Sequence, residues 1–490
     1  MTAPADVHAP TPTPTPTSVP APTASREDLE ALLARMKAAQ RRGGAPSHDD
    51  RIRSLERLER AIVARKVAIA EAISRDFGNR SRHETLVAEV FLVLGAIKYA
   101  KANLKDWMEP QQRETGLVFL PARTEVLAQP LGVVGIISPW NYPVQLALSP
   151  LVSVIAAGNR AILKPSELAP ETASLLRDLV AETFAPDEVA VVTGGSELGE
   201  AFSRLPFDHL VFTGSTRVGK AVMRAASDNL VPVTLELGGK SPAIVATDFS
   251  VTSAADRIMA GKLFNAGQTC IAPDYVLVPE GAVDAFVEAC RASAAKMYPT
   301  LAKNPDYTSI VSDRHLARLQ GYIADAKERG AKVVECNPGG ESLEGTRKLA
   351  PTLITGADDD AVVMQEEIFG PVLPVRAYRS LDEALAYVND HPRPLALYLF
   401  SHDRATTDRV LAETISGGVT VNETMLHVAQ DDLPFGGVGP SGMGHYHARE
   451  GFDAFTKRKP VFRQARINTT GLLRPPYGKT VDALLRFLVG

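Results

Sequence analysis

The first hundred residues carry apolar side chains at helical spacing. From Arg26 to Met108 an apolar residue recurs every three or four positions, as on a helix with one buried face. The first stretch has Leu29, Leu32, Leu33 and Met36, and the second has Ile52, Leu55, Leu58 and Ile62. The pattern predicts three helices, the last from about Glu84 to Lys105, and Asp49 or Asp50 can cap the second.

The pattern then changes to short apolar runs that alternate with helical stretches. The runs predict strands at residues 133–137, 161–164, 189–193 and 209–213, with helices at 144–157, 170–183 and 196–204. Strands that alternate with helices form βαβ units and a parallel sheet. Because such sheets bind ligands beyond the C-terminal ends of their strands, we expect the chemistry there.

After Glu236 the alternation begins again. The expected strands lie at residues 243–245, 274–279, 332–335, 352–354, 372–378 and 396–400, and the expected helices at 251–264, 282–297, 313–329, 381–389 and 403–413. The sequence therefore predicts an α/β protein with two doubly wound parallel-sheet domains.

The segments outside these two halves have patterns of their own. Leu117–Leu120 and Thr124–Ala128 predict two strands around Pro121, and the end of Phe452–Lys459 predicts a strand that can pair with them. Residues 1–25 are rich in Thr-Pro repeats, which predict an extended, disordered tail. Residues 483–490 are amphipathic and too short to span a bilayer, so we expect a docking helix.

Composition excludes several classes of protein. A net charge of -4 over 490 residues lacks the basic excess of a nucleic-acid-binding protein. The three cysteines are too sparse for a disulfide framework or a zinc pattern, and His445 and His447 lack a partner ligand, so we expect no metal site. No apolar run reaches the roughly 18–20 residues of a membrane span, and no signal peptide is evident. We expect a protein of the reducing cytoplasm.

Two residues stand out as candidates for chemistry. Cys270 lies between a predicted helix and a predicted strand, where a thiol can face a cleft, although a lone cysteine is more often packed in a core. Glu236 ends an apolar run just before Gly238 and Gly239. It can face a site at the end of a strand, although a solvated glutamate fits the same pattern.

The segments around these two residues resemble the general-base and catalytic cysteine segments of the aldehyde dehydrogenase superfamily. Residues 235–242 read Leu-Glu-Leu-Gly-Gly-Lys-Ser-Pro, and residues 267–270 read Gly-Gln-Thr-Cys. Four more segments match in the right order, namely Pro139–Pro143, Lys164–Glu167, Phe212–Thr216 and Glu366–Pro371. The resemblance covers nearly the whole chain, from about Arg26 to Phe462.

The resemblance implies a role for each of three residues. Cys270 would add to an aldehyde and form a thiohemiacetal, whose oxyanion the Asn141 amide and the Cys270 backbone N–H would stabilise. Hydride then leaves for a nicotinamide cofactor. Glu236 would be the general base for the water that hydrolyses the remaining thioester, which gives a carboxylic acid.

The resemblance also implies where the cofactor binds. No GxGxxG fingerprint follows the first strand. Instead Gly214, Ser215 and Gly219 lie between a strand and a helix, where backbone N–H groups favour phosphate, although a simple helix cap would look the same. Glu367 and Phe369 match residues that hold the nicotinamide ribose and ring.

Lys164 and Glu167 match the residues that contact the hydroxyls of the adenosine ribose. A surface ion pair would show the same two residues. The charge of Glu167 disfavours a 2′-phosphate, which favours NAD over NADP, although relatives with this residue can use both.

The family architecture divides the chain into parts. The expected parts are a disordered tail at residues 1–25, a variant Rossmann NAD(P)-binding domain at 26–116 and 131–235, a catalytic domain at 236–435, oligomerisation strands at 117–130 and 436–465, and a C-terminal tail at 466–490. A homodimer is expected, and a tetramer is possible.

The substrate is indicated by three segments. Residues 268–275 and 435–444 resemble the class 3 branch of the superfamily, which takes aromatic and medium-chain aldehydes. Asn468–Gly478 is similar to the bacterial coniferyl aldehyde dehydrogenases within it, which oxidise a phenylpropenal to a cinnamic-type acid. The side chains that could line an apolar tunnel are Tyr142, Leu146, Ile271 and Met425.

Other functions remain open. A medium-chain aliphatic aldehyde could be the substrate. The same Cys270, Asn141 and Glu236 could serve an ester or thioester hydrolase, although the cofactor segments count against it. A coenzyme-A-dependent acylating enzyme is disfavoured by Glu236, which favours hydrolysis. A non-catalytic binding protein is disfavoured because the catalytic-type residues are all present.

Overall fold

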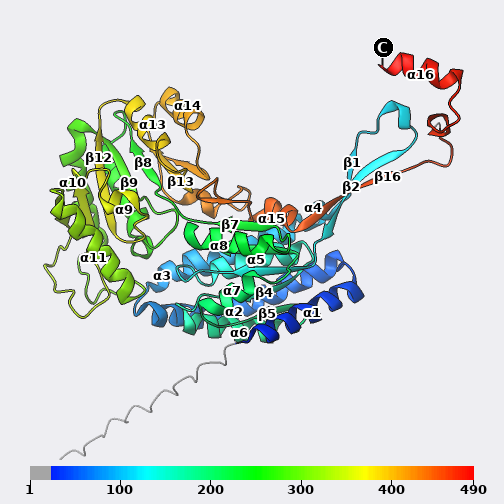
Figure 1. The fold of residues 1–490 in the computed structure, drawn as a ribbon. Helices are drawn as coiled ribbons and strands as arrows, with labels where there is room; N and C mark the ends of the chain where they lie inside the picture. The colour runs from blue at the N-terminus through cyan, green and yellow to red at the C-terminus, as the bar shows by residue number, and fades with distance from the viewer. Residues whose placement is uncertain (1–23, 469, 490) are drawn as a thin grey trace, which may run out of the picture.

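Two largely parallel sheets and a projecting three-stranded arm organise the protein (Figure 1). This computed structural model describes residues 24–468 and 470–489. The predicted α/β fold with two parallel-sheet bodies is confirmed. Residues 1–23 of the expected N-terminal tail lie outside the described residues.

The first sheet has six strands in the order β15-β7-β6-β3-β4-β5, and all its pairs are parallel except β15 with β7. Its strands are β3 (Val133–Ile137), β4 (Arg160–Lys164), β5 (Val189–Val191), β6 (His209–Thr213), β7 (Val233–Glu236) and β15 (Gly442–Met443). The connecting and flanking helices are α1 (Arg26–Gly43), α2 (His48–Phe77), α4 (Leu92–Met108), α5 (Gln145–Ala156), α6 (Pro170–Thr183), α7 (Ser196–Ser203), α8 (Thr216–Ser227) and α15 (Ala448–Ala454).

The second sheet has seven strands in the order β10-β11-β12-β9-β8-β13-β14. Its strands are β8 (Pro242–Val245), β9 (Tyr275–Pro279), β10 (Lys332–Glu335), β11 (Thr352–Thr355), β12 (Val372–Tyr378), β13 (Ala396–Phe400) and β14 (Gly418–Val421). Its helices are α9 (Val251–Leu263), α10 (Val283–Met297), α11 (Asp313–Glu328), α12 (Val362–Gln365), α13 (Leu381–Asn389) and α14 (Arg404–Glu413). The chain passes from the first sheet to the second between β7 and β8.

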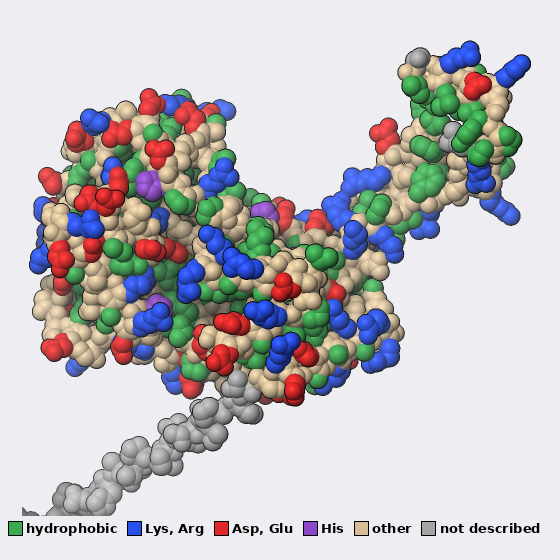
Figure 2. Space-filling view, in the orientation of Figure 1, with side chains coloured by type: hydrophobic (Ala, Val, Ile, Leu, Met, Phe, Trp, Pro, Cys, Tyr) green, Lys and Arg blue, Asp and Glu red, His purple; other side chains and the backbone are tan. Residues whose placement is uncertain are grey.

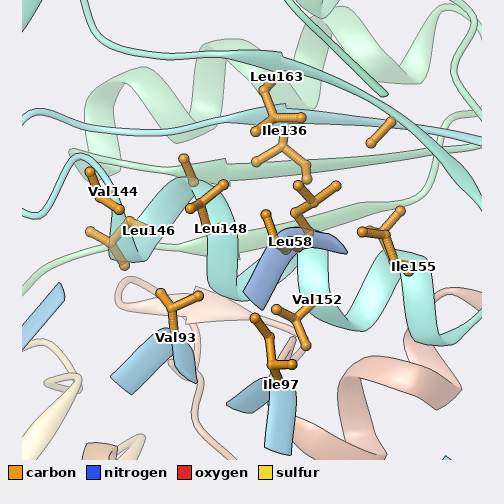
Figure 3. Close-up of a cluster of buried hydrophobic side chains, with 14 of the residues drawn as sticks. Leu58, Val93, Ile97, Ile136, Val144, Leu146, Leu148, Val152, Ile155 and Leu163 are labelled. Atoms are coloured by element: carbon orange, nitrogen blue, oxygen red, sulfur yellow. The ribbon is translucent and has the colours of Figure 1, made fainter. Parts of the chain in front are cut away.

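The largest buried apolar cluster lies between the first sheet and its helices (Figure 3). Leu148 of α5 faces Ile136 and Leu163 of the sheet, and Val152 of α5 faces Ile97 of α4. All twelve residues of α5 are buried. This helix begins next to the predicted active-site loop, so its packing holds that loop in place.

The arm differs in part from the sequence prediction. Its strands are β1 (Gln111–Arg113), β2 (Arg123–Pro130) and β16 (Thr456–Arg463), with both neighbours antiparallel to β2. The predicted pairing of β16 with the hairpin is therefore confirmed. The predicted strand at Leu117–Leu120 is wrong, because Leu117–Phe119 is a turn of 3-10 helix. Leu117 is exposed, and Pro121 has no N–H to donate to a ladder, so neither burial nor pairing favours a strand there.

Two other segments also differ from expectation. Residues 436–455 do not join the arm, because they form a loop, β15 and α15 against the first body. The expected C-terminal helix is present as α16 (Lys479–Val489), but it lies at the tip of the arm and not against either α/β body (Figure 1). Figure 2 shows hydrophobic side chains exposed at this tip. Within the described residues, no helix combines the length and the apolar character needed to cross a membrane.

A fully buried ion pair lies beneath the start of α5. Between α3 (Arg82–Thr85) and α4 the helix widens into a π-helical segment, Leu86–Phe91, which carries Glu89. The Glu89 carboxylate lies 2.7 Å from the Arg80 guanidinium and accepts the backbone N–H groups of Val144 and Gln145 at 2.7 and 3.0 Å. A carboxylate at a helix N-terminus is stabilised by the unpaired N–H groups there.

We expect Glu89→Gln to lower the free energy of unfolding by about 3–5 kcal/mol, because it leaves the Arg80 charge buried without its partner. The measurement is urea unfolding followed by circular dichroism. The matched control is Glu413→Gln, which removes an exposed ion pair with Arg409 and should change nothing measurable. A loss for Glu89→Gln no larger than the control's would contradict the prediction.

Candidate active site

Cys270 is presented by an unusually bent segment. After α9 the chain passes through Asn265, Ala266 and Gly267, whose φ angles are 52°, 50° and 75°. Three consecutive positive φ angles are costly for side chains other than glycine, so surrounding contacts must hold them. At Gly267 a side chain would also meet the Gly370 carbonyl oxygen at 2.3 Å. The bend leaves Cys270 half-buried at the edge of the second body's core.

Hydrogen bonds fix this bend to the loop that carries Asn141. The Asn141 amide donates to the Gln268 carbonyl at 3.2 Å, and the Asn265 amide donates to the carbonyls of both Gln268 and Asn141. Glu84 accepts the Asn265 backbone N–H at 3.1 Å. The structure therefore brings Asn141 beside the cysteine loop, as the sequence prediction requires, and leaves one N–H of its amide free for another acceptor.

Glu236 lies at the C-terminal end of β7 and is 2% exposed. Neither of its carboxylate oxygens has a hydrogen-bond partner among the described residues. Burial raises its pKa well above the usual range. An unpartnered buried carboxylate is costly to charge, which explains the direction of this shift.

The thiol of Cys270 shares its surroundings with two carboxylates. Burial raises the pKa of Cys270 to about 12, with further contributions from the negative charges of Glu367 and Glu236. The backbone N–H groups of Cys270 and Ile271 act against this shift by hydrogen bonding to the sulfur. The structure thus brings the Cys270 thiol close to two carboxyl groups, although Glu367 had been expected only as a cofactor ligand.

Glu367 and Phe369 lie on one loop that faces this site. Burial and the charge of Asp274 raise the pKa of Glu367 to about 8, and one of its oxygens has no partner within the described chain. A side chain at Gly238 would lie 2.1 Å from the carboxylate of Glu367, which explains the glycine in that motif. Phe369 has a φ of 51° and packs its ring edge-on against Trp140 at 5.5 Å.

The other predicted cofactor residues lie along the edge of the first sheet. Lys164 is the last residue of β4, is almost fully buried, and lies 3.0 Å from the Glu167 carboxylate. Ser215 caps α8 through its side chain. The Gly214 N–H donates to the Glu236 carbonyl at 3.0 Å, so the turn at the helix start is fixed directly to the end of β7.

These groups fit a nicotinamide dinucleotide. A lysine and a carboxylate held together can donate to and accept from neighbouring ribose hydroxyls, and the free oxygen of Glu367 can accept from another. The glycine-containing start of α8 offers backbone N–H groups to a phosphate. At Gly219 a side chain would lie 2.6 Å from Leu237, so this glycine allows close packing of α8 on the sheet.

Sequence reasoning missed the residues that hold the site together. Arg80, Glu84 and Glu89 lie behind the Asn141 loop, and Arg318 donates to the carbonyls of Glu367 and Ile368. These charged residues could have been noticed because they interrupt an otherwise apolar helical pattern at residues 80–93.

Lys262 of α9 was also missed. It is 1% exposed, and its ammonium has no partner within the described chain. Burial lowers its pKa to about 8, which the negative charges of Asp274 and Glu367 partly oppose. A buried amine that titrates near neutral pH beside Glu367 adds a third group that can exchange a proton there.

The chain belongs to the aldehyde dehydrogenase family, which it matches over residues 3–461. It is 54% identical over 457 residues to a probable coniferyl aldehyde dehydrogenase of Pseudomonas aeruginosa, covering 93% of this chain and 95% of the relative. It is 48% identical over 466 residues to a coniferyl aldehyde dehydrogenase of a Pseudomonas species, covering 94% and 96%. The resemblance inferred from the motifs is confirmed.

Solved structures agree with this assignment. A substrate-bound Staphylococcus aureus AldH has a TM-score of 0.89 and 41% identity, with 94% of this chain and 99% of that chain covered. A Mycobacterium tuberculosis aldehyde dehydrogenase complexed with NAD+ has a TM-score of 0.83 and 30% identity, with 92% of each covered.

Within residues 24–468 and 470–489, no group of three or more metal-binding side chains is gathered.

The pKa of Cys270 can be tested by alkylation with iodoacetamide. Because the thiolate is the minor form up to about pH 10, the rate should rise about tenfold per pH unit while the neighbouring charges stay constant. Glu367 becomes charged as the pH rises through about 8, and that charge holds the thiol protonated. We therefore expect Glu367→Gln to react faster than the unaltered protein above pH 8 and equally below it.

Peptide mass spectrometry would assign the alkylated residue, since Cys290 and Cys336 are also present but buried. Glu413→Gln, on the surface, is the matched carboxylate control and should leave the pH profile unchanged. Equal rates for Glu367→Gln and the unaltered protein above pH 8 would show that this charge does not act on the thiol.

Proposed function

We propose that the protein oxidises an aromatic phenylpropenal, such as coniferyl aldehyde, to the corresponding acid with NAD as the hydride acceptor. The observation that carries the chemistry is the convergence of Cys270, unpartnered Glu236 and the half-free amide of Asn141. The substrate is supported by relatives named for coniferyl aldehyde at 48–54% identity over nearly their whole length.

In this proposal Cys270 forms the carbon–sulfur bond. The sulfur adds to the aldehyde carbon, and the thiol proton passes to a neighbouring base. The carbonyl oxygen becomes an oxyanion that accepts the free N–H of Asn141 and the backbone N–H of Cys270. One such donor is worth about 3–4 kcal/mol in the transition state. Bound NAD would supply the hydride acceptor, and loss of hydride from this carbon would leave a thioester on Cys270.

Glu236 then acts on water. As a carboxylate it removes a proton from the water that attacks the thioester carbon, the carbon–sulfur bond breaks, and the acid leaves. Because burial raises the pKa of Glu236, the base form becomes more populated as the pH rises. Thioester hydrolysis should therefore become faster with increasing pH until Glu236 is fully ionised.

The same proposal covers cofactor choice and assembly. The Glu167 carboxylate would repel a 2′-phosphate, which favours NAD, with NADP possible. A homodimer joined through the arm is supported by exposed apolar residues there, among them Leu117 and Phe462, which are 86% and 50% exposed. We place the protein in the cytoplasm, where a free catalytic thiol stays reduced.

The experiment that tests the proposal compares coniferyl aldehyde, hexanal and benzaldehyde, each with NAD and with NADP. Reduced cofactor is followed at 340 nm with correction for the aromatic aldehydes, and the acid is quantified by chromatography. We expect coniferyl aldehyde with NAD to give the highest kcat/KM and Cys270→Ala to abolish turnover. A higher kcat/KM for hexanal would indicate that the substrate is an aliphatic aldehyde and not an aromatic one. Cleavage of p-nitrophenyl acetate without any cofactor reduction would favour the hydrolase.

Rapid mixing separates the role of Glu236 from that of Cys270. In Glu236→Gln the thioester should form but hydrolyse slowly, because the base for water is missing while the nucleophile remains. We expect a burst of about one reduced cofactor per active site, followed by steady turnover lowered about 10²- to 10⁴-fold. Cys270→Ala is the control and should show neither burst nor turnover. The absence of a burst in Glu236→Gln would mean that Glu236 is required before the thioester forms.

A further inference from the structure

A narrow cavity lies behind the active site, between α4, α5 and the loop that precedes α15. Its volume is about 30 Å³, and a single water needs roughly 10–15 Å³, so it has room for a hydroxyl or methoxy group but not for an aromatic ring. Small side chains on both helices create the space, and its walls include Ala96, Tyr99, Trp107, Ser149, Val152 and Val428.

The cavity connects to the apolar surroundings of Cys270 through shared side chains. Val428 lines the cavity and also packs against the cluster that contains Ile271 and half-buried Cys270. His447 lines it too, and its ring stacks on Phe435 of the same cluster with centroids 5.2 Å apart. The cavity and the surroundings of Cys270 therefore border the same apolar cluster.

Two polar groups face this cavity without partners. Asp431 is half-buried, and its carboxylate makes no hydrogen bond or ion pair within the described part of the chain. Its oxygen would lie 3.3 Å from a side chain at Gly95, so it rests against the backbone of α4. Nε2 of His447 is buried and also lacks a partner among the described residues.

The neighbouring carboxylate behaves differently, which makes Asp431 distinctive. Asp432 is exposed and accepts the hydroxyl of Tyr99, so its charge is already satisfied. Burial raises the pKa of Asp431, whereas a hydrogen-bond donor brought to it would stabilise its charged form. Burial lowers the pKa of His447 to about 4, so this ring is neutral and carries one donor and one acceptor nitrogen.

We propose that Asp431 is a specificity-determining residue that accepts a hydrogen bond from a hydroxyl on the distal end of the aromatic ring of the substrate. The inference rests on the proposed function and narrows the substrate class to 4-hydroxylated aromatic aldehydes. The ring lies along the apolar side chains between Cys270 and the cavity, and His447 bounds the same end. A ring without the hydroxyl leaves the Asp431 carboxylate unpaired, which is how a polar site discriminates against it.

Binding without turnover gives the direct test. In Cys270→Ala no thiohemiacetal forms, so calorimetry can report the affinities of 4-hydroxycinnamaldehyde, 4-methoxycinnamaldehyde and cinnamaldehyde. A hydrogen bond to a charged group corresponds to about 10- to 100-fold in affinity. We expect that preference for the 4-hydroxy compound over the other two, and we expect Asp431→Leu, made on the same background, to remove it.

Two further variants keep the test decisive. Asp431→Asn preserves shape and an acceptor oxygen, so it should retain part of the preference and shows whether the loop still folds. Asp432→Asn is the matched control and should retain all of it. Equal affinities for the three aldehydes before any change at Asp431, or equal losses for all three in Asp431→Leu, would overturn the inference.

Steady-state turnover tests the proposed function separately from binding. In the protein with Cys270 intact, Asp431→Leu should raise KM for 4-hydroxycinnamaldehyde about 10- to 100-fold and leave kcat and the parameters for cinnamaldehyde nearly unchanged. Absence of cofactor reduction with every aldehyde would reject the proposed function, while the binding arm would still decide whether Asp431 recognises the hydroxyl.

Discussion

The buried carboxylate of Glu89 is the interaction on which the active site depends. It joins the Arg80 guanidinium to the first N–H groups of α5, and Arg80 in turn donates to the Asn141 carbonyl at 2.9 Å. An ion pair without solvent exposure contributes little net stability, but losing either partner is costly. The pair therefore acts chiefly by joining the Asn141 loop to the start of α5.

The hydrogen bonds continue from this ion pair to the segment that carries Cys270. The Asn141 carbonyl accepts from Asn265, and both residues bond to the Gln268 carbonyl. Gln268 itself is held by Ser309 and Val311 of the second body. These bonds stabilise three left-handed residues that would otherwise relax. The strain is confined to this bend. The hydrogen bonds hold the bend, which presents Cys270 beside Asn141 and the carboxylates.

The sequence predicted what depends on local pattern and failed where distant residues decide. The alternation of strands and helices predicted both sheets, and the motifs singled out Cys270, Glu236 and Asn141, which the structure brings close together. Arg80 and Glu89 escaped notice because their partners are the Asn141 loop and the start of α5, some 55–61 residues away. The error at Leu117–Leu120 arose because apolar character was taken for burial, whereas Leu117 is 86% exposed.

The same burial that defines the site also limits its charge. A thiolate and two carboxylates in one region of low dielectric repel one another, so raising the charge on any one of them holds the protons on the others. Burial raises the pKa of Cys270, Glu236 and Glu367, and it lowers the pKa of Lys262 to about 8. The Lys262 ammonium has no bonded partner in the described chain. Burial therefore favours the uncharged forms of these groups, and a positive charge brought beside Cys270 would favour the thiolate. The reactivity of the half-buried Cys270 thiol then depends on what enters the site.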